Sequence, residues 1–257
     1  MPEALLVCMA AGLIAGIGTG FAVLSAATVI SPMLISFLGC PWYEAVGIGL
    51  ASDVLASAVS AYIYKKHSNL DFKNGIYMIA AVLIMTIAGS YFSQYMPDRQ
   101  MGYFSVFTTC FLGLRFLVWP ATRNKALFPS QNPRKRAAMS VLCGLFIGFY
   151  CGFMGLGGGM MMLFILTSIL GYDLKTAVGT SVFVMTFIAL TGSVSHFYFG
   201  EMQPFLPFLA LCVIFTLAGA IVTSSLSNRM NATTTNRVTG IALLLLGIIM
   251  LLELHFT

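Results

Sequence analysis

The sequence predicts an all-α polytopic membrane protein built from two homologous repeats that face opposite ways in the bilayer. Three observations support this prediction: charges are scarce, charge-free stretches are long, and the two halves share a glycine pattern. Of the 257 residues, 8 % are charged and 59 % are hydrophobic, whereas about a quarter of the residues of a soluble domain carry a charge. This composition excludes an ordinary cytosolic enzyme, a disordered chain and a nucleic-acid-binding protein.

The charge-free stretches are long enough to cross a membrane, which takes about 20 apolar residues in a helix. They cover residues 4–43, 74–97, 137–172, 176–200 and 202–228. At 1.5 Å per residue the first stretch would reach about 60 Å as one helix, twice the thickness of the hydrocarbon core. The first and third stretches must therefore each contain two crossings or a hairpin that turns back inside the membrane.

An internal duplication relates the two halves. Residues 12–47 align with residues 144–179 without a gap. The alignment places Gly12, Gly16, Gly20, Gly39 and Gly47 on Gly144, Gly148, Gly152, Gly171 and Gly179. Matched apolar residues mean little in so apolar a chain, but matched glycines indicate common descent of the halves. We predict a first repeat over residues 1–126, a cytoplasmic linker over 127–133 with bases on both sides, and a second repeat over 134–257.

Each repeat consists of a glycine-rich pair of segments followed by three plain helices. In the first repeat the segments are predicted at residues 4–21, 24–38, 43–64, 75–96 and 102–120. In the second repeat they are predicted at residues 137–154, 158–170, 175–198, 204–226 and 235–254. If each pair enters and leaves on one side of the membrane, each repeat crosses an odd number of times.

The charges of equivalent loops indicate that the repeats are inverted. Lys65, Lys66 and Lys73 lie between the third and fourth segments of the first repeat, whereas the matching loop of the second repeat has only Glu201. Because loops rich in Lys and Arg stay in the cytoplasm, the two loops lie on opposite sides. Both termini are then outside and the linker is inside. Inverted repeats are typical of transporters that bind substrate near the midplane.

Consecutive glycines interrupt the second repeat at mid-membrane depth. Gly157 to Gly159 should unwind the helix, and a helix that restarts near Met160 would present its amides and positive dipole end to the gap, which suits an anion. The first repeat has Ser25 and Thr28 at the matching place. Two such breaks would surround a small anion with donors and no fixed cation. The candidate binding residues are Ser25, Thr28, Ser52, Gly155, Gly157, Gly158, Gly159, Thr180 and Ser181. For Gly144, Gly148 and Gly152, close helix packing is the competing interpretation.

These motifs resemble the TauE/SafE sulfite-exporter family of membrane permeases, also called DUF81 or TSUP. The resemblance rests on GFYCGFMGLGGG at 148–159, on LG-x4-[ET]-AVG at 38–47 and 170–179, and on the GxxxG opening of each half. It implies a transporter of small sulfur-containing anions, such as sulfite, sulfoacetate, other organosulfonates or thiosulfate, in the bacterial inner membrane. It also implies about eight spans in two four-helix units, whereas the loop charges favour an odd number per repeat. The first repeat departs from the motif at residues 25–27.

Three ionisable residues inside predicted helices are functional candidates. Asp53 lies in the middle of residues 43–64, where a carboxylate costs about 2.5 to 3.5 kcal/mol to insert. It is the candidate for proton coupling, and packing among neighbouring serines is the alternative. His196 and Arg115 are gating candidates. For His196 the alternative is a satisfied polar residue at a helix end, and for Arg115 it is a side chain that reaches toward the headgroups.

No cofactor or metal is expected, because the three histidines have no ligand spacing and the six cysteines form no CxxC pair. The sequence therefore does not favour a membrane-embedded enzyme. Met160 to Met162 favour packing over a soft ligand set. The expected partners are a small sulfur-containing anion and membrane lipid, and the glycine-rich helix faces leave a homodimer open. A channel for the same anion and a membrane scaffold without transport remain as alternative functions.

Overall fold

The computed structural model describes residues 2–118, 133–154, 158–200 and 206–227, together with some residues between 231 and 252. Within these ranges every regular element is a helix, which confirms the all-α prediction. Among the described residues, five helices are long and apolar enough to cross a membrane: Glu3–Gly20, Trp42–Lys66, Gly75–Ser93, Leu174–Phe199 and Leu206–Ser227. The protein is therefore a polytopic membrane protein.

The first half begins with a broken helix pair, as predicted. The first half contains α1 (Pro2–Ala22), α2 (Ala27–Leu38), α3 (Trp42–Lys66), α4 (Phe72–Ser93) and α5 (Asp98–Val118), of which α1 and α2 form the pair. Helix α2 ends at Gly39, whose φ of 61° is left-handed. The Gly39 amide donates to Ile35 O and the Cys40 amide to Leu34 O, so the last carbonyls of α2 have partners.

The second half repeats this order with one change. It contains α6 (Pro133–Met154), α7 (Gly158–Phe164), the π-helical turn η1 (Ile165–Ile169), α8 (Leu174–Phe199) and α9 (Leu206–Ser227). The segment predicted as one helix over 158–170 thus widens into a π turn, where the Thr167 hydroxyl donates to Leu163 O at 2.7 Å. Gly171 takes the same left-handed role as Gly39, with φ 69°. Most of the linker 127–133, and much of the segment predicted at 235–254, lie outside the described residues.

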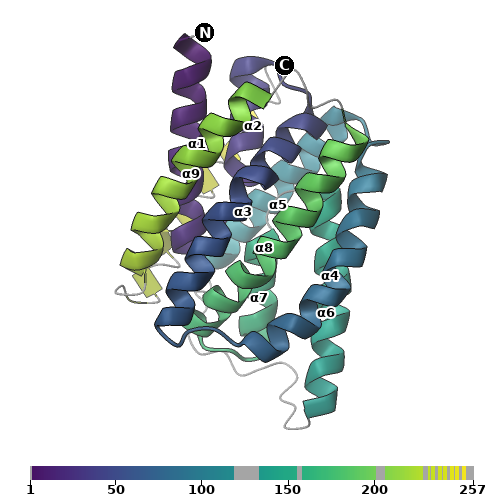
Figure 1. Cartoon of the computed structure of the whole chain (residues 1–257), viewed down its shortest axis with the longest axis vertical. Coiled ribbons are helices and arrows are strands. Elements are labelled where there is room, and N and C mark those ends of the chain that lie inside the picture. The colour runs from purple at the N-terminus through teal and green to yellow at the C-terminus, as the bar shows by residue number, and fades with distance from the viewer. Residues whose placement is uncertain are drawn as a thin grey trace.

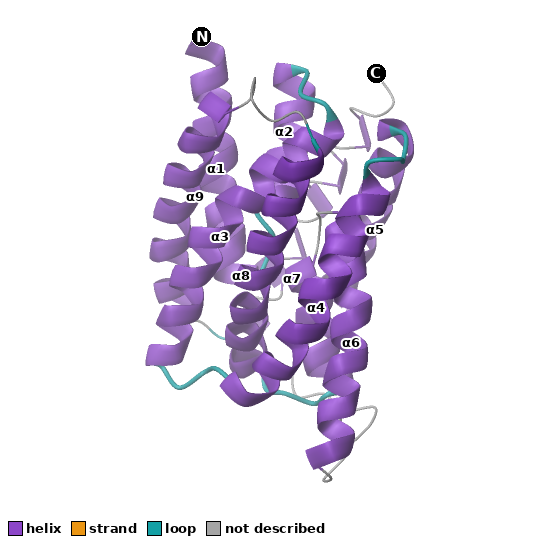
Figure 2. Ribbon diagram, turned by 45° about the vertical axis from the view of Figure 1, so that its right-hand side comes forward, coloured by secondary structure: helices purple, strands orange, loops and turns teal. Residues whose placement is uncertain are grey.

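The two broken pairs run into the molecule from opposite ends (Figure 1). Helix α1 starts at the top of Figure 1 and α2 returns toward that end, whereas α6 starts at the bottom and α7 turns back toward it. Helices α3 and α8 lie between them (Figure 2). They run the length of the molecule in opposite directions, as the colours of Figure 1 show. The bottom, where α3 ends and α4 and α8 begin, carries Lys65, Lys66, Lys73 and Lys175, and we name it the basic end.

Each half packs its first helix against the fourth helix of the other half. Helix α6 lies along α4, α1 lies along α9, and α3 and α8 pack against each other at the centre. A Cβ added to Gly144 would lie 2.9 Å from Met78 O, and one added to Gly12 would lie 2.8 Å from Phe215 Cβ. The approach is closer still at Gly148 and Gly152, which face α4, and at Gly16 and Gly20, which face α9. This confirms the packing interpretation of Gly144, Gly148 and Gly152, since only glycine permits such contacts.

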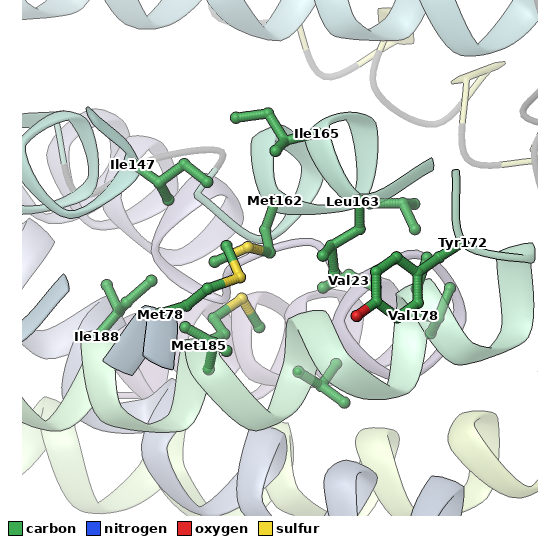
Figure 3. Close-up of a cluster of buried hydrophobic side chains, with 14 of the residues drawn as sticks. Val23, Met78, Ile147, Met162, Leu163, Ile165, Tyr172, Val178, Met185 and Ile188 are labelled. Atoms are coloured by element: carbon green, nitrogen blue, oxygen red, sulfur yellow. The ribbon is translucent and has the colours of Figure 1, made fainter. Parts of the chain in front are cut away.

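The largest core cluster lies where the two halves meet (Figure 3). Figure 3 shows the side chains of Met78, Met162 and Met185 pointing toward one another, with Val23 of the first half close by. All four are buried, and they come from α4, α7, α8 and the segment between α1 and α2. Flexible thioethers fill irregular space well, so this core joins the two broken pairs and holds them together.

Candidate functional site

The break of the first half, residues 23–26, is held open by a turn with left-handed backbone at Val23 (φ 57°). The Leu24 amide donates to Gly18 O at 3.2 Å, which folds the chain back after α1. The Thr19 hydroxyl lies 2.8 Å from Leu24 O, 3.1 Å from Ala15 O and 3.3 Å from Asp53 Oδ1. One hydroxyl has one proton, so Thr19 can donate to only one of these acceptors at a time.

Asp53 is 0 % exposed and lies at mid-length of α3. The Ser25 hydroxyl and the Ala26 amide approach its carboxyl group from the break. Asp53 Oδ2 and Ser25 Oγ nevertheless complete no hydrogen bond with any residue that the structure describes. Buried polar atoms in native proteins almost always have partners, so one unpaired carboxyl oxygen beside an unpaired hydroxyl indicates a place where a proton or ligand binds.

The N-terminal end of α2 faces this acid. Backbone amides at a helix start lack partners within the helix and carry the positive end of the helix dipole. Here the Thr28 amide donates to Ser25 O at 2.9 Å, and the turn that this bond closes presents Ala26 to Asp53. The carboxyl group therefore occupies the position that an anion would take at the start of α2.

The break of the second half touches this region directly. A Cβ on Gly159 would clash with Val23 O and would lie 2.5 Å from Met185 Sδ. A Cβ on Gly158 would clash with Cys151 Sγ. Gly159 is therefore the point where the start of α7 meets the first break. Gly155 and Gly157 lie outside the described residues.

The duplication gives Asp53 and Thr19 unlike counterparts. In the alignment of the halves Asp53 pairs with Met185, and Thr19 pairs with Cys151. A polar pair in the first half thus corresponds to a sulfur pair in the second. Met185 and Cys151 are both buried and neither is a carboxylic acid, so among the described residues Asp53 of the first half is the one acid at this place.

The other predicted binding residues divide into two groups. Thr28 and Ser181 are buried near the breaks, Thr28 in the first turn of α2 and Ser181 one helical turn before Met185 on α8. The Ser52 hydroxyl instead donates within its own helix, to Ile48 O at 2.8 Å. Thr180 Oγ1 accepts the Asp71 amide at 3.0 Å and so lies against the loop at the basic end, away from Asp53.

The two gating candidates lie away from the breaks. His196 is 0 % exposed near the end of α8, and its ring meets that of Tyr43 edge-on at 4.2 Å between centroids. Neither ring nitrogen has a hydrogen-bond partner among the described residues. The Arg115 guanidinium lies 5.1 Å from the Phe164 ring centroid, and its Nη2 lies 3.5 Å from Ser168 Oγ. Arg115 therefore holds α5 against the second broken pair.

Sequence reasoning missed Thr19 and Tyr64. Thr19 lies in the last turn of α1, directly before the first break, and its hydroxyl approaches Asp53, 34 positions away in the chain. Tyr64 donates to Ser227 Oγ at 2.9 Å, although the two residues are 163 positions apart. A polar side chain in a glycine-rich apolar helix was the only signal for Thr19, and an apolar-looking aromatic residue near a helix end carried none for Tyr64.

Comparison with known proteins agrees with this arrangement. The chain is 23 % identical over 249 residues to the probable membrane transporter protein YunE of Bacillus subtilis, covering 92 % of this chain and 90 % of that protein. It is 25 % identical over 243 residues to a probable membrane transporter protein of Haemophilus influenzae, covering 90 % and 89 %. It is 21 % identical over 215 residues to the probable membrane transporter protein YdhB of Bacillus subtilis, covering 84 % and 87 %. No solved structure matches the chain significantly.

Long apolar helices around two opposed breaks, with one buried acid between them, define the class of polytopic membrane transporters. The family model described as sulfite exporter TauE/SafE matches residues 8–250. The chain belongs to this family.

Proposed function

We propose that the protein is a secondary transporter that exports a small sulfur-containing anion by alternating access between two inverted repeats. The candidate substrates are sulfite, sulfoacetate or a related organosulfonate, and thiosulfate. The observation that carries the proposal is the first break, where Asp53 Oδ2 and Ser25 Oγ lie buried at the start of α2 without a hydrogen-bond partner among the described residues. The description of the family as sulfite exporters supports the substrate class.

In this proposal the carboxyl group of Asp53 itself fills the anion site while no substrate is bound. When Asp53 is ionised it accepts hydrogen bonds from Thr19, Ser25 and Ala26, and its charge repels a second anion. When it takes up a proton it becomes neutral and releases those donors to the substrate. Each bound anion is then accompanied by one proton, which makes Asp53 the proton-coupling residue.

The charge balance of this step is compatible with export. Thiosulfate and sulfoacetate are divalent, so one accompanying proton leaves a single net negative charge. A negative interior favours the exit of that charge by about 2.3 kcal/mol per 100 mV. For a monovalent anion the proton cancels the charge, and the concentration and pH gradients alone set the direction.

The orientation follows from the charges at the two ends. Lys65, Lys66, Lys73 and Lys175 lie at the basic end, whereas Glu3 and Glu44 lie in the first turns of α1 and α3 at the other end. Under the positive-inside rule we place the basic end in the cytoplasm of a cell with an inner membrane. The start of α1 is then outside.

A thermal-shift experiment on the detergent-purified protein tests the substrate class. The ligands compared are sulfite, thiosulfate, sulfoacetate, taurine, sulfate and chloride. A ligand that binds only the folded state raises the free energy of unfolding, by about 2.7 kcal/mol at a concentration 100 times Kd, and so raises the melting temperature. Ser25→Ala should reduce the shift, whereas Ser225→Ala, which removes an exposed hydroxyl on α9, should not. A shift that survives Ser25→Ala unchanged would place the anion elsewhere.

The role of Asp53 is tested by the pH dependence of the same shift. The wild-type protein should bind the anion more tightly as the pH falls, and Asp53→Asn should bind it with no dependence on pH. In liposomes, saturation and counterflow of the anion distinguish a transporter from a channel. A scaffold would show neither binding nor flux. Gly158→Leu is unsuitable as a control, because the new side chain would clash with Cys151.

A further inference from the structure

Tyr64 ties three helices together at the basic end. Its ring is 1 % exposed, its hydroxyl donates to Ser227 Oγ of α9 at 2.9 Å, and Gly20 O of α1 lies 3.5 Å from the same oxygen. A Cβ on Gly179 of α8 would lie 3.0 Å from Tyr64 Cβ, so α8 also packs against it. The basic end is closed around this side chain.

A second set of contacts closes the same end. The Tyr172 hydroxyl donates to Asp71 Oδ2 at 2.6 Å, and the Asp71 amide donates to Thr180 Oγ1 at 3.0 Å. These bonds join the segment before α8, the loop between α3 and α4, and α8 itself. The basic end therefore has a continuous polar connection between the two halves.

His196 is the counterpart of Tyr64 in the duplication. Extending the alignment of residues 12–47 with 144–179 along the next helix places Tyr64 of α3 on His196 of α8. Each lies near the end of its helix, and each is buried. The two residues mark opposite ends of the molecule, because α3 and α8 run in opposite directions (Figure 1).

The partners of Tyr64 have counterparts as well. Gly20 aligns with Gly152. Gly12 packs on Cys212 of α9 as Gly144 packs on Met78 of α4. This register places Ser227 of α9 on Ser93 of α4. Ser93 is 4 % exposed at the last residue of α4.

The two counterpart sets differ in their hydrogen bonds. Tyr64 is bonded to Ser227, but His196 makes no hydrogen bond with Ser93, Gly152 or any other described residue. Gly152 O accepts the Ser90 hydroxyl instead, at 3.3 Å. A buried imidazole with two unpaired nitrogens is unfavourable unless another conformation satisfies it. The structure thus shows the hydrogen bond of Tyr64 formed and the counterpart bond of His196 not formed.

We infer that Tyr64 and His196 are alternating latches, meaning side chains whose hydrogen bonds hold closed one end of the transporter at a time. His196 bonds to Ser93 Oγ or Gly152 O when the end opposite the basic end closes. The inference rests on the proposed alternating access and names the residues that control it. In the present conformation the Tyr64 latch is closed, so the substrate path is shut at the basic end. Closing the His196 latch requires the Tyr64 latch to open, because α3 and α8 take part in both: Tyr64 of α3 packs on Gly179 of α8, and His196 of α8 packs on Tyr43 of α3.

Hydrogen exchange measured by mass spectrometry on the protein without substrate tests the pair. Tyr64→Phe keeps the ring and removes the donor, so amides at the basic end, residues 64–71 and 174–181, should exchange faster. His196→Phe keeps the ring packed on Tyr43 and removes both nitrogens, so the same amides should exchange more slowly. Loss of one neutral hydrogen bond should change these rates by about fivefold. Amides at residues 40–47 and 192–199 should change in the opposite sense.

The chain offers matched controls for both changes. Tyr62→Phe alters a tyrosine of α3 that is 69 % exposed, and Tyr198→Phe alters a tyrosine of α8 that is 82 % exposed; neither should move the exchange rates of either end. Ser227→Ala should reproduce Tyr64→Phe, and Ser93→Ala should reproduce His196→Phe. Combining a latch residue with its own serine should add nothing further.

Two results would overturn the inference: Tyr64→Phe and His196→Phe shifting both ends in the same direction, or Ser93→Ala leaving exchange unchanged while His196→Phe alters it. The measurement needs no substrate, so it stands apart from the test of the proposed function. Opposite shifts without anion binding or flux would refute the substrate class and keep the latches. Anion flux without opposite shifts would refute the latches and keep the transporter.

Discussion

The bond from Thr19 to Asp53 permits a test of whether the acid is ionised. Thr19→Val keeps the shape of the side chain and removes the hydroxyl that lies 3.3 Å from Asp53 Oδ1. The change is made in two backgrounds, wild type and Asp53→Asn. The asparagine oxygen still accepts a hydrogen bond but carries no charge, so the two backgrounds differ only in the strength of that bond.

The expected magnitudes follow from the charge on the acceptor. A hydrogen bond between neutral groups contributes about 1 kcal/mol, and one to a charged group about 1.5 to 3 kcal/mol. If Asp53 is ionised, Thr19→Val should lower the free energy of unfolding by about 1 to 2 kcal/mol more in the wild-type background than in Asp53→Asn. As the pH falls and Asp53 becomes protonated, that difference should disappear.

The free energy of unfolding is measured by reversible denaturation in mixed micelles at several pH values. Thr186→Val is the control, because its hydroxyl donates within α8 to Val182 O at 2.9 Å and does not approach Asp53. Equal costs of Thr19→Val in both backgrounds at every pH would refute the reasoning. Thr19 would then donate to Leu24 O, at 2.8 Å, and would take no part in holding the acid.

Three further predictions concern single positions. Gly39→Ala should lower the free energy of unfolding by about 1 to 2 kcal/mol through backbone strain alone, because no atom lies within 4 Å of the new Cβ. Gly159→Ala should lower it more and alter anion binding, because its Cβ would clash with Val23; thermal melts compare the two variants. Cys40, between α2 and α3, should resist alkylation at pH 8, because burial and the Glu44 charge raise its pKa to about 12 and leave little thiolate; rapid labelling of intact protein would contradict this. Asp173→Ala should cost about 1 kcal/mol, because Asp173 accepts the Thr176 amide at 3.0 Å as the N-cap of α8; Asp173→Asn should restore most of it in the same melts.

Local sequence features predicted the helices closely. The third segment, predicted at 43–64, is observed at Trp42–Lys66, and the ninth, predicted at 204–226, is observed at Leu206–Ser227. Continuous apolar runs define such helices without reference to the rest of the chain. The breaks were equally local, since small residues at 25–27 and glycines at 157–159 interrupt an otherwise apolar stretch.

The candidate site could be predicted only in part. Asp53 was identifiable because an acid inside an apolar helix is costly in any fold. Thr180 was assigned to the break from its neighbours in sequence, but its hydroxyl bonds to the loop before α4. Ser52 was assigned likewise, but it bonds within its own helix. Helical spacing shows which residues share a face and leaves open which helix that face meets.

The sequence by itself determined the membrane environment, the order of the helices, the two breaks and the buried acid, because each depends on the cost of moving nearby groups from water into lipid. Only the tertiary structure decided that Thr19 faces Asp53, that Gly159 touches Val23, and that Tyr64 bonds to Ser227 while His196 has no counterpart bond. Those contacts join residues far apart in the chain, and they depend on how α1, α4, α6 and α9 exchange partners between the halves. Local patterns carry no record of that exchange, because it is fixed by the fit of whole helix faces.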